Sequence, residues 1–333
     1  MNAKLQLSRH PKNMITLGLS YLTSWLTGTP RVWGTPLVVM IEPTNRCNLK
    51  CPLCHVGSGK LRREPRNLTI SEFETILDKL PNTVRVLQLW NQGEPFMNPQ
   101  FLDMVRLAND RGYHTITSTN AHFLNRNGTA ESVIAGGLGE LVVSLDGVTP
   151  DTYESIRKHG DLSVVLEGIK LIASTKAASG SQSPQISAQC LLLKQLESSL
   201  SQVQKLAMES GADRVIWKTA QVSSLKEAHS VLPENQRLWR YRIKNNALVT
   251  RRHWEGCART WFSTVVLCDG TVVPCCFDKD GDYVMGNLLT QSFPEIWQGD
   301  PYMEFRHQTV RRRAYPICNN CTEGLSNLYV KIP

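Results

Sequence analysis

Ten cysteines are the residues of this 333-residue chain whose type and spacing could do chemistry. One group runs from Cys47 to Cys54, a second runs from Cys257 to Cys321, and Cys190 stands alone between them. This content is far below the roughly 8–10% of a disulfide scaffold, and a core of this size needs no covalent staples. No secretory signal is visible, so we expect a cytoplasmic protein whose cysteines bind metal, act in catalysis or are buried. Two separate groups predict two metal sites.

The first group has the spacing Cx3Cx2C within the run EPTNRCNLKCPLC, directly after a predicted strand. Three thiolates so close together suit three corners of one compact cluster. A tetrahedral zinc site would need a fourth ligand, for which His55 is the candidate. A four-iron cluster on Cys47, Cys51 and Cys54 would instead leave one iron open, where a substrate or cofactor could bind.

Short β-rich runs alternate with helical patterns from about residue 37 to residue 220. The predicted strands are Leu37–Glu42, Val84–Trp90, His114–Thr119, Leu141–Leu145, Gln185–Leu193 and Arg214–Lys218. Runs such as LVVM and LVVSL are apolar on both faces, as parallel strands covered by helices should be. Six units are too few for a closed eight-stranded barrel. The sequence therefore predicts an α/β fold with an open, partial (βα)6 TIM-like barrel, whose chemistry lies at the carboxyl ends of the strands.

Polar motifs stand at four successive strand ends. The cysteine motif follows the first strand, Gly93 and Glu94 follow the second, Asn120 follows the third and Ser144 ends the fourth. In this order the motifs resemble the radical S-adenosylmethionine (SAM) superfamily, and the resemblance covers roughly residues 37–220. Its Gly-Glu-Pro segment is similar to the family's GGEP, its TNA to the family's TNG-type strand end, and VVSLDG is a frequent family form.

Two positions depart from the family pattern, since Gln92 replaces the first Gly of GGEP and Ala121 replaces the Gly of TNG. The resemblance implies that the Gly-Glu-Pro segment receives the SAM amino group. It also implies a ribose or carboxylate contact from Ser144, and Arg157 is a further carboxylate candidate. The residues implied to bind SAM are Gly93, Glu94, Asn120, Ser144 and Arg157.

The family's chemistry is the generation of a 5′-deoxyadenosyl radical, which abstracts hydrogen from a C–H bond while the protein binds, orients and shields. An electron must reduce the cluster, and we expect a flavodoxin- or ferredoxin-like donor. Our first expectation is an oxidoreductase-like enzyme that oxidises or epimerises a small polar substrate such as a sugar or aminocyclitol.

Two alternatives remain at this point. One is peptide modification, although only 46 residues precede Cys47, which is short for a separate leader-peptide-binding domain. The other is a non-catalytic iron-sulfur or zinc scaffold. Glu94 and Ser144 argue against a scaffold, because a scaffold needs no SAM site.

The second cysteine group resembles the auxiliary-cluster domain called SPASM, in its shortened Twitch form, over about residues 257–325. The resemblance implies one auxiliary [4Fe-4S] cluster held by Cys257, Cys275, Cys318 and Cys321, and Gly270 fits a tight turn between the first two. A four-cysteine zinc ribbon is the rival interpretation. Cys321 is the last cysteine in the sequence, which speaks against a second auxiliary cluster.

Three thiols, Cys190, Cys268 and Cys276, are left over as weak candidates for donating hydrogen to a substrate radical. Burial is the more ordinary role of such cysteines. Cys276 adjoins a predicted ligand. On the predicted fifth strand, Cys190 and Gln189 lie on opposite faces. If the polar face lines the barrel, Cys190 should point to the helices.

The predicted organisation has four parts: an N-terminal helical extension (1–35), the barrel (36–220), a helical linker (221–256) and a small α+β Twitch/SPASM-like domain (257–333). In the extension, Ile15, Leu19, Leu22 and Leu26 repeat at helical spacing. The helix either packs on the main domain or lies on a membrane surface, helped by Lys4, Arg9 and Lys12.

The chain carries a formal net charge of +8, which weakly favours anionic partners. Arg214 and Lys218 alternate on the predicted sixth strand and are candidates to reach a substrate. No nucleic-acid-binding module is visible, and no run of apolar residues is long enough to span a membrane. The expected partners are therefore a small-molecule or peptide substrate and an electron donor.

Overall fold

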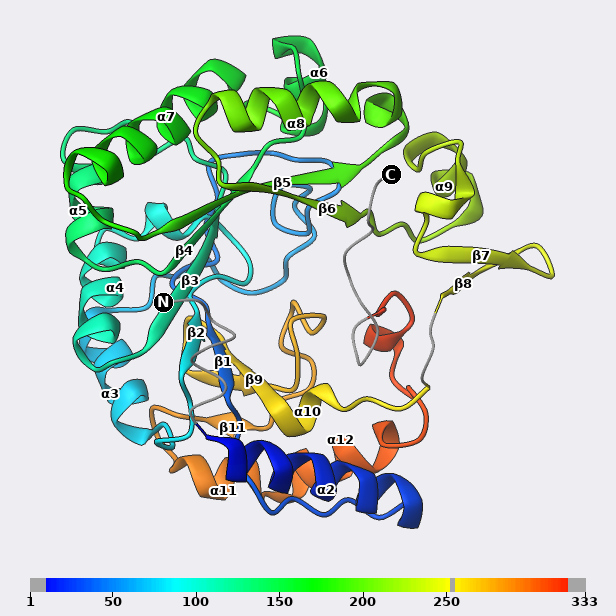
Figure 1. Cartoon of the computed structure of the whole chain (residues 1–333). Helices are drawn as coiled ribbons and strands as arrows, with labels where there is room; N and C mark the ends of the chain where they lie inside the picture. Colours follow the sequence, from blue (N-terminus) through cyan, green and yellow to red (C-terminus); the bar gives the residue numbers. More distant parts are fainter. Residues whose placement is uncertain (1–9, 252–254, 323–333) are drawn as a thin grey trace.

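The computed structural model describes residues 10–251 and 255–322, and a curved parallel sheet runs through its centre (Figure 1). The first six strands are hydrogen-bonded in chain order, and each is parallel to the one before it. They are β1 (Val38–Ile41), β2 (Val86–Gln88), β3 (His114–Thr119), β4 (Glu140–Ser144), β5 (Gln185–Leu192) and β6 (Arg214–Thr219). The predicted α/β class with an open (βα)6 barrel is confirmed.

Helices connect the successive strands and cover the outside of the sheet (Figure 1). They are α3 (Ile70–Lys79), α4 (Phe101–Asp110), α5 (Thr129–Ala135), α6 (Pro150–Ile156), α7 (Leu162–Ala178) and α8 (Leu200–Glu209), with short 3-10 turns η1 (Pro95–Met97) and η2 (Lys194–Ser199). Helix α3 shows how the sequence starts such an element, because Thr69 and Glu72 form a reciprocal capping box. Its apolar residues Phe73 and Ile76 are completely buried in the core.

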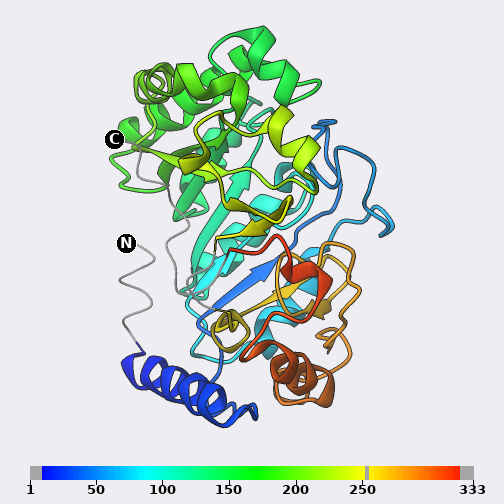
Figure 2. The ribbon, with the colours of Figure 1, turned by 90° about the vertical axis from the view of Figure 1, so that its right-hand side faces the viewer.

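Helix α2 (Pro11–Thr27) precedes the barrel and lies along its edge (Figure 2). The chain turns at Gly28 and returns along the inner face of the helix, where the Arg31 amide donates to Ser24 Oγ (2.8 Å). Tyr21 packs edge-on against Trp261, with 5.1 Å between ring centroids. This helix is therefore fixed to the C-terminal part of the chain by its polar and aromatic inner face.

The C-terminal segment continues the barrel sheet. Strand β9 (Ser263–Val266) pairs in parallel with β1, so that Val38 lies opposite Ser263 and Ile41 opposite Val266. Strands β10 (Thr271–Val273) and β11 (Gly286–Asn287) extend the sheet in antiparallel fashion to nine strands. The other elements of this part are α10 (Arg259–Phe262), α11 (Phe293–Trp297), α12 (Asp300–Thr309) and η4 (Pro316–Cys318).

The prediction of a helical linker over residues 221–256 is wrong for much of its length. It holds one short helix, α9 (Leu225–Val231), and the 3-10 turn η3 (Gln236–Leu238), followed by a hairpin of β7 (Tyr241–Lys244) and β8 (Ala247–Thr250). The hairpin turn is the Asn-Asn pair 245–246, and both residues have positive φ (50° and 57°), as tight two-residue turns require. Residues 252–254 of the predicted linker lie outside the described residues.

Within the described ranges, none of the helices combines the length and apolar character that crossing a membrane requires.

Candidate active site

The carboxyl ends of β1 to β4 deliver the predicted site residues to one edge of the barrel. The loop after β1 carries Cys47, Cys51 and Cys54, all of which are free thiols. The amide of Leu49 donates to Cys47 Sγ (3.5 Å), and burial raises the pKa of the Cys47 thiol to about 11. Burial also raises the pKa of Cys51. Buried thiols of this kind ionise when a metal supplies the positive charge.

A single zinc ion at these thiols would depend on His55 as its fourth ligand. Within the described residues, no three His, Cys, Asp or Glu side chains are grouped closely enough to hold one ion. His55, the candidate fourth ligand for zinc, directs its Nε2 to Asp280 Oδ2 (2.9 Å). The donor set therefore suits a three-cysteine iron-sulfur cluster.

The Gly-Glu-Pro segment after β2 lies directly against the cysteine loop. The amide of Glu94 donates to the carbonyl oxygen of Arg46 (2.7 Å). Gly93 has φ +79°, and a Cβ there would lie 2.6 Å from the carbonyl oxygen of Thr44. Only glycine satisfies both constraints, so this contact explains why the segment needs Gly93 even though Gln92 has replaced the preceding glycine.

Glu94 is buried, and its carboxylate is held by the end of β3. It accepts from Thr119 Oγ1 (2.7 Å), from the Asn120 amide (2.7 Å) and from the Phe96 amide (3.3 Å). Burial raises its pKa to about 7, and these hydrogen bonds oppose the rise. A buried carboxylate that is poised near neutrality is suited to binding a ligand's ammonium group.

Asn120 joins the third strand end to the cysteine loop. Its Nδ2 donates to Asn48 Oδ1 (2.8 Å) and lies 3.9 Å from Cys47 Sγ. Ala121 next to it has φ +68°. This left-handed conformation favours glycine, which accounts for the Gly that the family carries where this chain has Ala121.

Arg157 reaches the site from the end of α6. Its Nε donates to Asp146 Oδ2 (2.6 Å), and Asp146 is completely buried after β4. Although burial alone would lower it, the Asp146 carboxylate and the Cys51 thiol raise the pKa of Arg157 above its ordinary value. Ser144 is buried at the end of β4 and pairs with Gln189 of β5. Sequence reasoning missed Asp146, although it is the aspartate of the VVSLDG motif.

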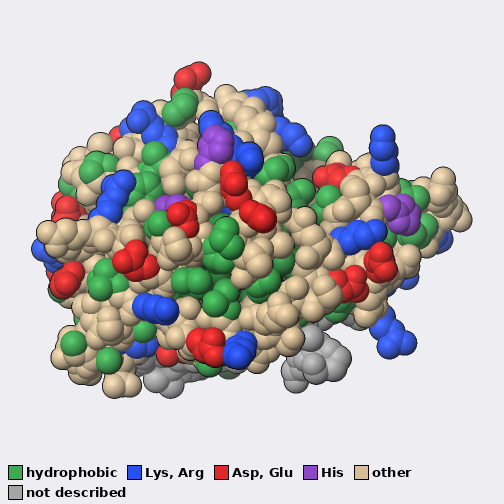
Figure 3. Space-filling model, turned by 90° about the horizontal axis from the view of Figure 1, so that it is seen from above, with side chains coloured by type: hydrophobic (Ala, Val, Ile, Leu, Met, Phe, Trp, Pro, Cys, Tyr) green, Lys and Arg blue, Asp and Glu red, His purple; other side chains and the backbone are tan. Residues whose placement is uncertain are grey.

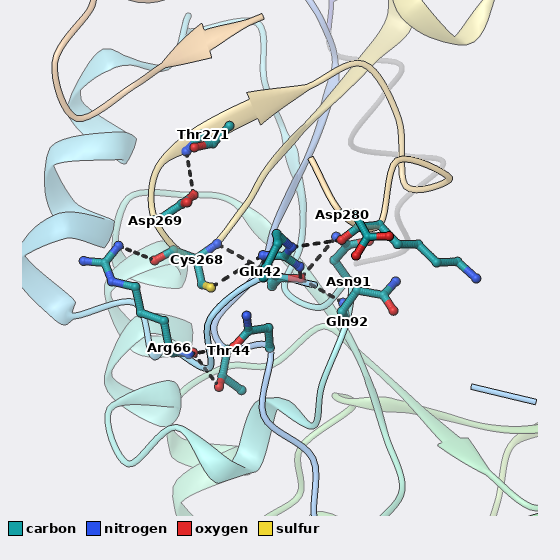
Figure 4. Close-up of polar contacts among 12 residues, drawn as sticks. Glu42, Thr44, Arg66, Asn91, Gln92, Cys268, Asp269, Thr271 and Asp280 are labelled. Carbon is teal, nitrogen blue, oxygen red and sulfur yellow. Dashed lines mark hydrogen bonds and ion pairs between the residues drawn. The ribbon is translucent and has the colours of Figure 1, made fainter. Parts of the chain in front are cut away.

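A buried carboxylate that the sequence did not single out connects the site to the C-terminal segment (Figure 4). Glu42, the residue after β1, is completely buried and accepts two hydrogen bonds from Arg63, each of 2.7 Å. It also accepts from the amides of Gln92 (3.1 Å) and Cys268 (3.2 Å) and from Asn91 Nδ2 (3.2 Å). Glu42 therefore ties the residues just before the Gly-Glu-Pro segment, the loop after the cysteines and the C-terminal segment together. The sequence feature that could have identified Glu42 is its position: it is a single acidic residue at the end of an apolar strand, just before the cysteine motif.

The barrel encloses a cavity of about 320 Å³. Its lining comes from all six barrel strands and the C-terminal segment, and its charged side chains are Glu140, Arg214, Lys218 and Arg259. Arg214 pairs with Glu140 at 3.2 Å. Cations therefore outnumber carboxylates in this chamber.

The three leftover thiols lie in different surroundings. Cys276 lines the chamber, together with Gln189. Cys190 is fully buried in the core behind β5, as the alternation of that strand indicates. Cys268 is also buried, and Arg63 lies 3.8 Å from its sulfur. Among the described residues, Cys276 is the one of these three thiols that lines the chamber.

The four cysteines predicted for the auxiliary cluster come from separate parts of the C-terminal segment. Arg313 donates to the carbonyl oxygens of Cys321 (3.0 Å) and Gly256 (3.4 Å), which brings both ends of the segment together. The pKa of the Cys275 thiol lies well above its ordinary value. Burial is the main cause, and the nearby thiols of Cys276 and Cys257 add to it. Cys318 lies on η4 and is buried.

Comparison with known families decides what this arrangement is. Residues 41–176 match the model of the radical SAM superfamily, and residues 257–322 match that of SPASM, an iron-sulfur cluster-binding domain. The chain belongs to the radical SAM superfamily. It is an enzyme, and its cofactors are SAM and iron-sulfur clusters, so the zinc and scaffold alternatives are not supported.

Curated relatives of this radical SAM enzyme include a cofactor-modifying protein, a maturase and a peptide cyclase. The tungsten-containing aldehyde ferredoxin oxidoreductase cofactor-modifying protein of Pyrococcus furiosus is 24% identical over 318 residues, which cover 85% of this chain and 86% of that protein. The mycofactocin maturase MftC of Mycobacterium ulcerans is 24% identical over 307 residues, covering 86% and 80%. The PqqA peptide cyclase of Bradyrhizobium diazoefficiens is 35% identical over 121 residues, covering 36% and 31%.

A solved structure of SuiB from Streptococcus suis, bound to its precursor peptide SuiA, has a TM-score of 0.63 at 14% identity. The match covers 91% of this chain and 74% of that one. At this identity the likeness shows the fold alone.

Proposed function

We propose that this radical SAM enzyme modifies a peptide or protein. The observation that carries the proposal is the similarity to MftC, by name a maturase, across 86% of the chain. The shorter match to a PqqA peptide cyclase supports the same substrate class. These relatives favour the peptide alternative over the sugar or aminocyclitol that we first expected.

We assign the SAM-binding cluster to Cys47, Cys51 and Cys54. When bound there, the cluster and SAM supply a radical that takes hydrogen from a C–H bond. The chain's own contribution is positioning. We assign to Glu94 the role of accepting hydrogen bonds from the SAM amino group. We assign to Arg157 the role of SAM carboxylate partner, which its contacts with Asp146 and with the Cys51 thiol support.

The charged side chains that line the chamber favour a substrate with an acidic group. Arg214, Lys218 and Arg259 line it together with one carboxylate, Glu140, and opposite charges attract more strongly near a protein surface than in bulk water. About 320 Å³ is at the small end of ligand pockets. One side chain therefore enters the chamber while the rest of the peptide stays outside.

The auxiliary cluster belongs, in this proposal, on Cys257, Cys275, Cys318 and Cys321. A two-electron oxidation of the substrate releases a second electron after hydrogen abstraction, and an iron-sulfur cluster can accept one electron. A flavodoxin- or ferredoxin-like donor would supply the first electron.

The proposal is tested with the full chain, purified and reduced without oxygen. It is mixed with SAM and either a pool of short peptides containing Asp and Glu or a pool of sugars and aminocyclitols. Peptides should increase 5′-deoxyadenosine formation several-fold over the background and should lose hydrogen by mass spectrometry, whereas Glu94→Gln should give neither signal. Stimulation by the sugar pool without stimulation by peptides would overturn the proposal.

A further inference from the structure

The outward face of helix α2 is unusually apolar for an exposed surface. Its side chains Ile15, Leu19, Leu22 and Leu26 are 63%, 53%, 49% and 61% exposed. At 3.6 residues per turn, these four positions fall within an arc of roughly 60°. Scattered exposed leucines are common, but a continuous stripe of them marks an interaction surface.

The stripe points away from the protein because the opposite face of the helix is already fixed. The buried residues of α2 are Leu17, Ser20, Tyr21 and Ser24. Asn13 also holds the return segment, since its Nδ2 donates to the Thr35 carbonyl oxygen (2.8 Å). Turning the helix to bury the stripe would break these contacts, so the apolar stripe stays outside.

The charges of the segment that contains the stripe are all positive. Residues 1–41 contain four Lys or Arg and no Asp or Glu. Lys12 and Arg31 are exposed beside the helix, whereas Lys4 and Arg9 lie outside the described residues. Arg311 lies at the other end of α2, where its Nε donates to the carbonyl oxygen of Trp25 (2.6 Å).

An exposed tryptophan lies in the segment that returns along the other face of the helix. Trp33 is 55% exposed in the segment that follows the helix, and tryptophan is enriched where a membrane meets water. The opposite end of the molecule, over α7 and α8, looks different, because positive and negative side chains are mixed there (Figure 3).

We propose that helix α2 docks this enzyme onto the surface of an anionic phospholipid bilayer, with Ile15, Leu19, Leu22 and Leu26 inserted below the headgroups. An exposed apolar stripe in a segment that carries only positive charge is what such an interface binds, and each nearby cation adds attraction to anionic lipid. A second copy of the chain fits less well, since it would bring two all-positive segments face to face. This surface is independent of the proposed substrate.

Vesicle sedimentation tests the docking directly. The full chain should sediment with vesicles of phosphatidylcholine and phosphatidylglycerol, and binding should weaken with vesicles of phosphatidylcholine alone and at high salt. The variant Ile15→Ser/Leu19→Ser/Leu22→Ser/Leu26→Ser should lose at least ~tenfold in vesicle affinity, because it removes most of the inserted apolar surface. Lys12→Glu/Arg31→Glu should weaken binding to the anionic vesicles.

A matched control carries Met208→Ser and Val284→Ser, which lie outside α2 and are 47% and 52% exposed; its vesicle binding should be unchanged. Unaltered far-UV circular dichroism and iron content in the four-serine variant would show that folding is intact. Equal sedimentation of that variant and the parent would overturn the proposal. So would absence of vesicle binding together with a dimer, measured by light scattering, that the four serines dissociate.

Discussion

At the scale of single residues, the site depends on where buried carboxylates sit. Glu94 can be found from its motif, but the motif does not show that the Thr119 hydroxyl and the Asn120 amide hold it. Arg157 was a weak candidate in the sequence. It gains a clear role only with its partner Asp146, which lies eleven positions earlier in the chain and at the end of another element.

The raised pKa of Glu94 predicts how SAM binding depends on pH. Burial raises this pKa from 4.5 to about 7, so the carboxyl is largely neutral below pH 7 and ionised above it. Only the ionised form attracts the SAM ammonium group. SAM affinity, measured by calorimetry on the iron-loaded enzyme, should therefore rise as pH increases toward about 7 and fall again once the SAM amino group loses its own proton, at about pH 8.

Glu94→Gln keeps the size of the side chain and removes its titration. It should lower SAM affinity by roughly ten- to a hundredfold, the worth of a hydrogen bond to a charged group, and its affinity should be flat from pH 6 to about pH 7. A wild-type profile that is equally flat would show that Glu94 does not bind the ammonium group.

At the scale of elements, the strand order and the strand ends could be predicted because each βα unit carries its own local signals. The hairpin of β7 and β8 was missed because its polar, charged sequence suggested a helix, whereas the Asn-Asn turn at 245–246 decides the fold. The parallel pairing of β1 with β9 could not be predicted. It joins segments more than 200 residues apart, and no local pattern encodes such a partner.

Glu42 bonds to residues that the pairing of β1 with β9 brings together. Removing its carboxylate should therefore lower the stability of the fold. Glu42→Gln breaks a buried pair with Arg63, whose side chain is only 11% exposed. It also turns an amide nitrogen toward backbone donors. The free energy of unfolding should fall by about 3 kcal/mol, as for other broken buried pairs, measured by urea denaturation of the full chain.

Glu72→Gln provides the matched control. Glu72 pairs with Arg66, but their side chains are 23% and 37% exposed, and Gln still serves in the capping box of α3. This change should cost less than about 1 kcal/mol. Equal losses in the two variants would mean that Glu42 is an ordinary surface carboxylate in energetic terms.

At the scale of the whole molecule, the barrel and the C-terminal segment share one sheet yet keep separate metal chemistry. The proposed SAM site is built from residues 47–157, whereas the proposed auxiliary ligands lie between Cys257 and Cys321. The connection between them is backbone pairing of β1 with β9 and the contacts of Glu42. None of these contacts uses a proposed auxiliary ligand, so one cluster can be lost while the other site keeps its shape.

This separation predicts different outcomes for two cysteine variants. The parent enzyme should hold about eight irons per chain, as two four-iron clusters. Cys51→Ala should lose about four irons and all cleavage of SAM, because it removes a ligand of the cluster that SAM binds.

Cys318→Ala should also lose about four irons. It should still cleave part of the SAM, since Cys318 lies on η4 and is not one of the proposed ligands of the cluster that SAM binds. Iron assays and 5′-deoxyadenosine measurements on reduced protein decide the matter: about four irons in the parent would remove the auxiliary cluster, and complete loss of cleavage in Cys318→Ala would show that the two sites cannot be separated.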